Sequence, residues 1–141
     1  MSSKNIHLYR LGQVAYRDAL AWQLEIAAAV RSQETRDSLA ILEHTPVYTV
    51  GAQGGQDHLL VEETRLQARG AELVQSDRGG DITFHGPGQV VLYTIMNLRR
   101  RNLRPAEHVR RLEKTVIETL ETYGLVAVSY THLTLPTILL V

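Results

Sequence analysis

The stretch RGGDITFHGPGQ, residues 78–89, is the part of the sequence that decides the fold. It contains four of the ten glycines of the chain and runs directly into the apolar segment VVLYTIM, residues 90–96. Glycine adopts backbone conformations that other residues avoid, and it lets a ligand approach the main chain closely. A glycine pair after Arg78, followed by Thr83 and His85 two positions apart, therefore predicts a binding loop rather than a plain turn.

Taken alone, this loop could serve in three ways. Its backbone N–H groups could hold an anion or a carbonyl oxygen. Arg78 could pair with a carboxylate or a phosphate, and His85 could act as a general acid or base or orient a substrate. A glycine-rich hairpin with a surface arginine and a half-buried histidine is an equally good interpretation, because short glycine motifs often match by chance.

The segments on both sides of the loop predict a scaffold of strands and helices. Alternation within 81–85 would place Asp81, Thr83 and His85 on one face and Ile82 and Phe84 on the other. The segment 90–98 is apolar on both faces, which predicts a central strand covered on both sides. Further strands are expected over 6–11, ended by Gly12, and over 38–43, 47–50 and 71–75, with a break at Pro46.

Three helices are also expected. The first is Tyr16–Arg31, with Trp22 as a packing residue and with one face formed by Tyr16, Leu20, Gln23, Leu24 and Ala27. The second is a short helix over 62–69 closed by Gly70. The third begins near Pro105 and is closed by Gly124, and its apolar stripe consists of Val109, Leu112, Val116 and Leu120.

Length and composition limit the class of protein. A chain of 141 residues forms one domain at most, and 44% hydrophobic with 21% charged residues is typical of a globular protein. The net charge is zero, which gives no support for nucleic acid or a membrane as a partner, and three arginines at 99–101 are too few for a nucleic-acid patch. There is no cysteine, so a disulfide, a thiolate zinc site and a cysteine nucleophile are absent. No signal core or membrane-length apolar run is present, so a cytoplasmic location is expected, with no metal and no cofactor.

The last residues have a different character from the rest. VSYTHLTLPT, residues 128–137, resembles one reading frame of a transposon-type sequencing-library adapter. We therefore expect the natural sequence to occupy 1–127 and a non-native tail to occupy 128–141. Genomic sequence that continues unbroken across codon 127 of the source gene would contradict this.

Several motifs together resemble the signature of one enzyme family. Arg78-Gly79-Gly80, Thr83-Phe84-His85, Gly88-Gln89 and Tyr93 are similar, in register, to the lipoyl(octanoyl) transferases of lipoate synthesis. Upstream, LEHTPVYTVG, residues 42–51, resembles the segment that precedes the first substrate loop of that family.

The resemblance implies an α/β domain with a mixed sheet and flanking helices, a fold shared with biotin and lipoate protein ligases. The domain would be incomplete at its C-terminal end, and residues 1–127 would form the N-terminal part of the octanoyltransferase catalytic domain. It implies transfer of an octanoyl group from octanoyl-acyl carrier protein to a lysine of lipoyl domains, those of 2-oxoacid dehydrogenase complexes and the glycine cleavage H protein. In the family the acyl group passes through a cysteine thioester beside a lysine, without ATP. That cysteine and lysine have no counterpart here, so we expect the polypeptide to be inactive, and Lys114 is interpreted as an exposed helix lysine.

The resemblance also assigns a substrate-binding segment. His44 and Tyr93 are expected as neighbours of the site, although packing in the core explains Tyr93 equally well. No catalytic residue and no metal ligand is assigned. The residues of the acyl-substrate loop would be Arg78, Gly79, Gly80, Asp81, Ile82, Thr83, Phe84 and His85.

Two other functions remain open. The chain could be an ATP-dependent enzyme like the lipoate and biotin protein ligases, which adenylate a free acid and would form acyl-AMP from ATP and octanoate. It could instead be a non-catalytic acyl-binding domain that naturally lacks the cysteine.

Overall fold

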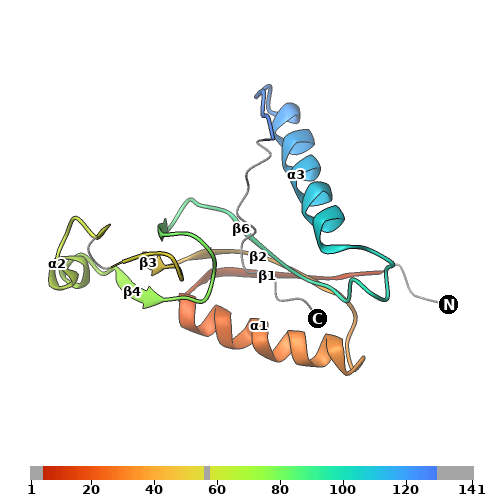
Figure 1. Ribbon diagram of the computed structural model, residues 1–141, viewed down its shortest axis with the longest axis horizontal. Helices are drawn as coiled ribbons and strands as arrows, with labels where there is room; N and C mark the ends of the chain where they lie inside the picture. Colours follow the sequence, from red (N-terminus) through yellow and green to blue (C-terminus); the bar gives the residue numbers. More distant parts are fainter. Residues whose placement is uncertain (1–4, 56–57, 130–141) are drawn as a thin grey trace.

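The computed structural model describes residues 5–55 and 58–129, and residues 130–141 of the expected tail lie outside this part. Mixed strands with helices beside them confirm the predicted α/β class (Figure 1). The elements are β1 (His7–Val14), α1 (Tyr16–Arg31), β2 (Ser38–His44), β3 (Val47–Val50), α2 (Glu63–Ala68), β4 (Glu72–Gln75), β5 (Ile82–His85), β6 (Val91–Ile95) and α3 (Pro105–Thr122).

One three-stranded sheet has the order β1-β2-β6. β2 lies in the centre, parallel to β1 and antiparallel to β6, so the sheet is mixed. The register places Ala40 of β2 between Tyr9 and Tyr93, and it brings Val14 opposite His44 where both strands end. This end of the sheet faces the glycine-rich loop.

The sequence predicted that Gly12 ends the first strand, but the strand continues past it. β1 continues to Val14, and its register against β2 shifts between Arg10 and Gly12. Gly12 has φ +66, a conformation that glycine adopts without a steric penalty. The glycine therefore accommodates a β-bulge inside the strand, and the strand continues to Val14, which lies opposite His44.

α1 covers one face of this sheet, with the bounds that the sequence predicted (Figure 1). Trp22 packs edge-on against Tyr9, with ring centroids 5.2 Å apart, which confirms its packing role. The predicted apolar face is wrong at Leu24, which is 53% exposed, because the helix is rotated to place small residues against β2. The buried residues of the interface are Ala19, Ala27 and Val30 of α1 and Ala40, Leu42 and Ile95 of the sheet.

β6 is not the covered central strand that the sequence predicted. In the described part of the chain it lies at the edge of the sheet and pairs with β2. Leu92 of β6 is 44% exposed, and Val90, which immediately precedes the strand, is 72% exposed. Figure 1 shows α1 along one face, whereas α3 rises away from the other. The second apolar face of β6 therefore belongs to an open sheet face, which also carries Leu8 and Ile41.

The second three-stranded sheet has the order β4-β3-β5. β3 runs parallel to β4 and antiparallel to β5. The break predicted at Pro46 is confirmed, since the chain passes there from one sheet to the other. The predicted short helix is also confirmed: α2 buries Leu66, and Gly70 closes it with φ +73.

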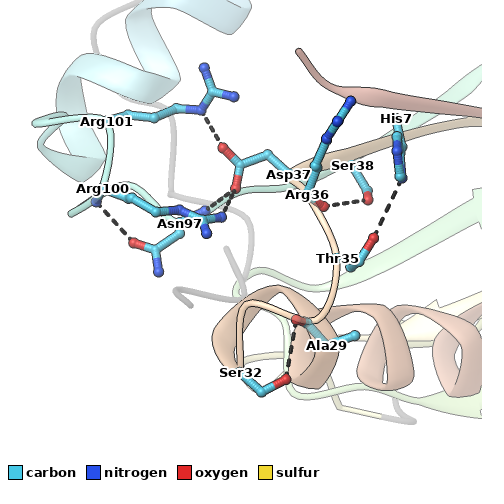
Figure 2. Close-up of polar contacts among 10 residues, drawn as sticks. All are labelled: His7, Ala29, Ser32, Thr35, Arg36, Asp37, Ser38, Asn97, Arg100 and Arg101. Atoms are coloured by element: carbon cyan, nitrogen blue, oxygen red, sulfur yellow. Dashed lines mark hydrogen bonds and ion pairs between the residues drawn. The ribbon is translucent and has the colours of Figure 1, made fainter. Parts of the chain in front are cut away.

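A buried carboxylate joins the start of β2 to the loop after β6 (Figure 2). Asp37 is 4% exposed and accepts hydrogen bonds from the Asn97 backbone N–H at 2.9 Å, from Arg100 Nη2 at 3.0 Å and from Arg101 Nε. Burial acts to raise the pKa of Asp37, but the hydrogen bonds from Asn97, Arg101 and Arg100 outweigh it and lower the pKa. Two of the three consecutive arginines thus have a structural partner.

α3 begins with Pro105 at its first position, as predicted, and Gly124 follows its end with φ +74. His108 is the buried residue of this helix, and its Nε2 lies 3.3 Å from Thr94 Oγ1 of β6. Of the predicted apolar stripe, Val109, Leu112 and Leu120 are half-buried, whereas Val116 is 55% exposed. Within 5–55 and 58–129, no helix combines the length and hydropathy needed to cross a membrane.

Candidate functional site

Two loops bind each other at the end of β3 and form the frame of the candidate site. The loop after β3 donates three backbone hydrogen bonds to the glycine-rich loop: Gly51 N–H to Asp81 O at 3.0 Å, Ala52 N–H to Arg78 O at 2.9 Å and Gln53 N–H to Gly80 O at 3.2 Å. The two backbones therefore form one rigid unit, although twenty-five or more residues separate them in the sequence.

Glycine is required where the two loops meet. A Cβ added at Gly51 would lie 2.3 Å from Gly80 O, and Gly80 itself has φ +85. Side-chain-bearing residues are strained at such a φ, and no Cβ approaches a carbonyl oxygen so closely. The predicted close approach at this glycine pair is therefore an approach of protein backbone to protein backbone.

Arg78 stabilises this frame from within. Its Nε donates to Thr49 Oγ1 at 3.0 Å and its Nη2 to Thr49 O at 2.6 Å. Nη2 also donates to Asp81 O at 2.5 Å, and Nη1 donates to Gly79 O at 3.0 Å. Four of the five N–H donors of a guanidinium are thus directed at the protein. In the structure the Arg78 side chain holds the loop, and its pairing with a carboxylate or a phosphate stays a prediction.

The other predicted loop residues lie in three environments. Asp81 is exposed and its Oδ2 lies 2.6 Å from His58 Nδ1, so it ties the loop to the segment before α2. Phe84 packs against Tyr48, with ring centroids 4.9 Å apart, and its ring covers Gly86. Thr83 is exposed, and Ile82 is half-buried.

A buried polar cluster lies behind His85, where the two sheets meet. His44 is fully buried; its Nδ1–H donates to Val14 O at 3.0 Å, and its Nε2 accepts from Tyr93 Oη at 2.7 Å. The His44 ring packs against the rings of Tyr16, at 5.4 Å, and of His85, at 5.8 Å. His44 thus packs against the glycine-rich loop through His85, whereas Tyr93 reaches the loop only through His44.

Burial keeps this cluster neutral. Burial lowers the pKa of His44, and the charge of His85 lowers it further against the opposing effect of the Val14 carbonyl. Burial also raises the pKa of Tyr93 to about 12, with Tyr16 adding to the effect. His44 therefore holds its hydrogen bonds as a neutral ring and does not serve as an acid at neutral pH.

The sequence did not assign roles to two residues that hold His85 and its turn. Gln89 Oε1 lies 2.6 Å from His85 Nδ1, and Glu43 Oε2 accepts the Gly88 backbone N–H at 2.9 Å. Both residues stand inside the motifs that carried the resemblance, so their presence was visible. Their contacts depend on a turn and on a distant strand, which spacing alone does not give.

A groove of about 380 Å³ opens next to Glu43, on the open face of the β1-β2-β6 sheet. Ile41, Leu42 and Val90 form its apolar wall, and none of residues 78–85 lines it. It is therefore separate from the glycine-rich loop. In the described part of the chain, no group of three or more histidine, aspartate or glutamate side chains is placed to hold a metal ion.

Comparison with known proteins gives a family. A family model described as "Lipoyl protein ligase A/B catalytic domain" matches residues 15–134. The chain is 44% identical over 123 residues to an octanoyltransferase of Laribacter hongkongensis, covering 86% of this chain and 56% of that protein. It is 46% identical over 117 residues to an octanoyltransferase of Azoarcus sp., covering 82% of this chain and 48% of that protein. The chain thus spans about half the length of the curated relatives it matches.

Solved structures agree on the fold. A lipoate-protein ligase A bound with ATP superimposes with a TM-score of 0.65 at 16% identity, over 92% of this chain and 52% of that one. A bi-partite lipoate protein ligase from Thermoplasma acidophilum gives a TM-score of 0.62 at 14% identity, over 89% of this chain and 48% of that one. The predicted lipoate-ligase-like fold is confirmed.

Proposed function

Because the chain belongs to the family of lipoyl protein ligase A/B catalytic domains, we propose that it provides the acyl-binding part of an octanoyltransferase. The reaction would move an octanoyl group from octanoyl-acyl carrier protein to a lysine of a lipoyl domain. The acceptors would be the lipoyl domains of 2-oxoacid dehydrogenase complexes and the glycine cleavage H protein. Relatives that are 40% to 46% identical are octanoyltransferases, whereas the ligases of known structure are similar at 14% to 16% identity, which supports the fold alone.

The observation that carries the proposal is the direction of the Arg78 donors. A ligase must first bind a free carboxylate and the phosphates of ATP, and an arginine in the substrate loop is well suited to both. Here that guanidinium is turned inward onto Thr49, Gly79 and Asp81. The loop therefore offers backbone groups and the side chains of Thr83 and His85, which suit an uncharged acyl thioester.

The transfer would proceed in two balanced steps. A cysteine thiolate attacks the carbonyl carbon of the carrier thioester, and the carrier leaves as a thiolate that takes up a proton. The lysine amine of the lipoyl domain then attacks the enzyme thioester, an amide forms, the enzyme thiolate is regenerated, and the amine proton passes to a base. The 141 residues contain no cysteine, so the thiolate has to come from outside them. We infer that this chain alone binds the acyl group without transferring it.

The test uses the purified chain with two sets of substrates. With octanoyl-acyl carrier protein and a lipoyl domain, we expect saturable binding and no octanoylated lipoyl domain. With ATP and octanoate, we expect no octanoyl-AMP. His85→Gln should weaken binding of octanoyl-acyl carrier protein, while the matched control His7→Gln, an exposed histidine of β1, should not.

Three results would overturn the proposal or part of it. Formation of octanoyl-AMP would support the ligase, and absence of binding would remove the acyl-binding role. A third experiment adds, as a separate polypeptide, the cysteine-bearing remainder of a similar octanoyltransferase. Transfer activity that appears only with both parts supports a transferase, and binding without any restored transfer supports a non-catalytic acyl-binding domain.

A further inference from the structure

The ring of His85 is held at one nitrogen by a side-chain oxygen. His85 Nδ1 lies 2.6 Å from Gln89 Oε1. An amide oxygen only accepts hydrogen bonds, so Nδ1 has to carry the hydrogen. A neutral imidazole has a single N–H, which leaves a lone pair on Nε2. We propose that Gln89 is a positioning residue that fixes His85 as the Nδ1–H tautomer and so keeps Nε2 as an acceptor.

The turn that presents Gln89 is itself anchored. Gln89 N–H donates to Gly86 O at 3.1 Å, and Gly88 has φ +84. The Gly88 N–H donates to Glu43 Oε2 at 2.9 Å, which ties the turn to β2. Phe84 packs over Gly86 so closely that a Cβ there would lie 2.6 Å from the ring. The backbone positions of Gln89 and His85 are therefore set by the fold, and the exposed Gln89 side chain reaches the His85 ring from this anchored turn.

Both ring nitrogens of the neighbouring His44 already make hydrogen bonds within the protein. His44 Nδ1–H donates to Val14 O, and His44 Nε2 accepts from Tyr93. No hydrogen bond reaches His85 Nε2 from any residue in 5–55 or 58–129, whereas Nδ1 is engaged. Of this pair of packed rings, His85 is the one that keeps a lone pair for a ligand.

This lone pair has a use in the proposed reaction, and that use rests on the proposed function. Acyl transfer to an amine releases a proton, and an imidazole nitrogen within reach can accept it. An Nε2–H tautomer would present a donor instead and would lose this ability. The tautomer itself can be measured without substrate.

The experiment is long-range ¹H–¹⁵N correlation of the histidine rings in the ¹⁵N-labelled chain, at an alkaline pH where imidazole is neutral. His85 signals are assigned with His85→Gln. In the parent chain we expect Nδ1 of His85 to be protonated and Nε2 to be unprotonated. Gln89→Leu removes the acceptor and should convert most of the population to Nε2–H, the form that a free histidine side chain prefers. Gln89→Glu keeps an acceptor and should keep Nδ1–H.

The chain supplies its own controls. His44 should stay Nδ1–H in every variant, because its acceptor is the Val14 carbonyl, and its signals report whether the cluster remains folded. Gln67→Leu removes a glutamine that bonds to Glu63 on α2, and it should leave His85 unchanged. Glu43→Leu should reduce the Nδ1–H population, whereas Glu43→Gln should retain it.

An Nε2–H tautomer of His85 in the parent chain would overturn the inference at once, whatever the variants do. So would an unchanged tautomer in Gln89→Leu with the His44 signals intact. Failure to bind octanoyl-acyl carrier protein would count against the proposed function alone, because the tautomer is read without any acyl substrate.

Discussion

Arg78 determines the shape of the glycine-rich loop through four hydrogen bonds to Thr49, Gly79 and Asp81. The guanidinium is planar and carries five donors in a fixed arrangement, which allows one side chain to reach several acceptors at once. A lysine ammonium is a single point of charge and cannot span them. The positive charge of Arg78 is therefore part of the scaffold.

We predict that Arg78→Lys lowers the free energy of unfolding by about 2 kcal/mol, the value typical for loss of hydrogen bonds made by a charged group. Urea unfolding followed by circular dichroism measures this. Arg17→Lys is the matched control, because its guanidinium is 69% exposed and lies 3.8 Å from Glu72. The control should change stability by less than about 0.5 kcal/mol. Equal effects of the two substitutions on the free energy of unfolding would contradict the role of Arg78 in holding the glycine-rich loop.

Individual residues were partly predictable from the sequence. His44 and Tyr93 were expected as neighbours of the site, and in the structure the His44 ring packs against both His85 and Tyr93. The inward direction of Arg78 was not predictable, because its acceptors are three backbone carbonyls and the Thr49 hydroxyl, whose positions depend on the folded loops. The pairing of Gln89 with His85 depends on a turn with a positive φ at Gly88, and spacing does not reveal it.

At the scale of elements, Asp37 fastens β2 to the loop between β6 and α3 (Figure 2). We predict that Asp37→Asn lowers the free energy of unfolding at neutral pH by about 2 kcal/mol, because the partly exposed Arg100 and Arg101 lose the charge of the buried carboxylate. The amide still accepts the Asn97 N–H, so the fold should be retained. Asp18→Asn, on the exposed side of α1, should have little effect.

The same residue predicts a pH dependence. The folded-state pKa of Asp37 lies below its ordinary value of 3.8, so the unfolded chain binds this proton more readily than the folded chain. The stabilisation is fully present above that ordinary value and is lost as the pH falls through the folded-state pKa. The difference in Tm between the parent and Asp37→Asn should therefore be large at neutral pH and should shrink at acid pH. A difference that stays constant down to the acid limit would contradict the assignment.

The helices differ in how much they contribute to the core. Ile95 is 2% exposed in the cluster with α1, so Ile95→Ala should cost about 2–5 kcal/mol. Val116 on α3 is 55% exposed, so Val116→Ala should change stability by less than about 0.5 kcal/mol. Thermal unfolding of the two variants measures this difference. A large effect of Val116→Ala would mean that α3 packs its stripe against the protein.

Elements with a clear local pattern were predicted best. The bounds of α1 and β3 agree with the sequence, because helical periodicity and a β-branched run ended by Gly51 are local signals. The end of β1 was wrong because Gly12 forms a bulge, which the sequence does not distinguish from a turn. The prediction of β6 as a central strand was wrong, because an apolar pattern on both faces also fits an edge strand with one open face.

The whole molecule exposes an apolar sheet face that α1 does not cover. Ile41 and Leu92 are directly paired across β2 and β6, and they are 38% and 44% exposed, with Leu8 at 52% on the neighbouring strand. Contiguous apolar surface of this kind favours association. We predict that the purified chain binds an apolar dye and self-associates in sedimentation experiments.

The double variant Ile41→Thr with Leu92→Lys should reduce dye binding and self-association and should keep the helical circular dichroism. Leu24→Lys changes an exposed leucine on α1 and should have a much smaller effect. A monomeric parent chain without dye binding would contradict this account of the open face. The division of the strands into two sheets could not be predicted from the sequence, because it depends on pairings between distant segments.

The most direct test of the central claim is an NMR titration of the ¹⁵N-labelled chain with octanoyl-pantetheine, an uncharged octanoyl thioester. We expect saturable shifts of backbone signals in residues 78–85 and in the loop at 51–54 that is bonded to them. Signals of α3 (Pro105–Thr122) should not move. Shifts confined to the groove beside Glu43, or no shifts at saturating thioester, would contradict the claim that the glycine-rich loop is the acyl site.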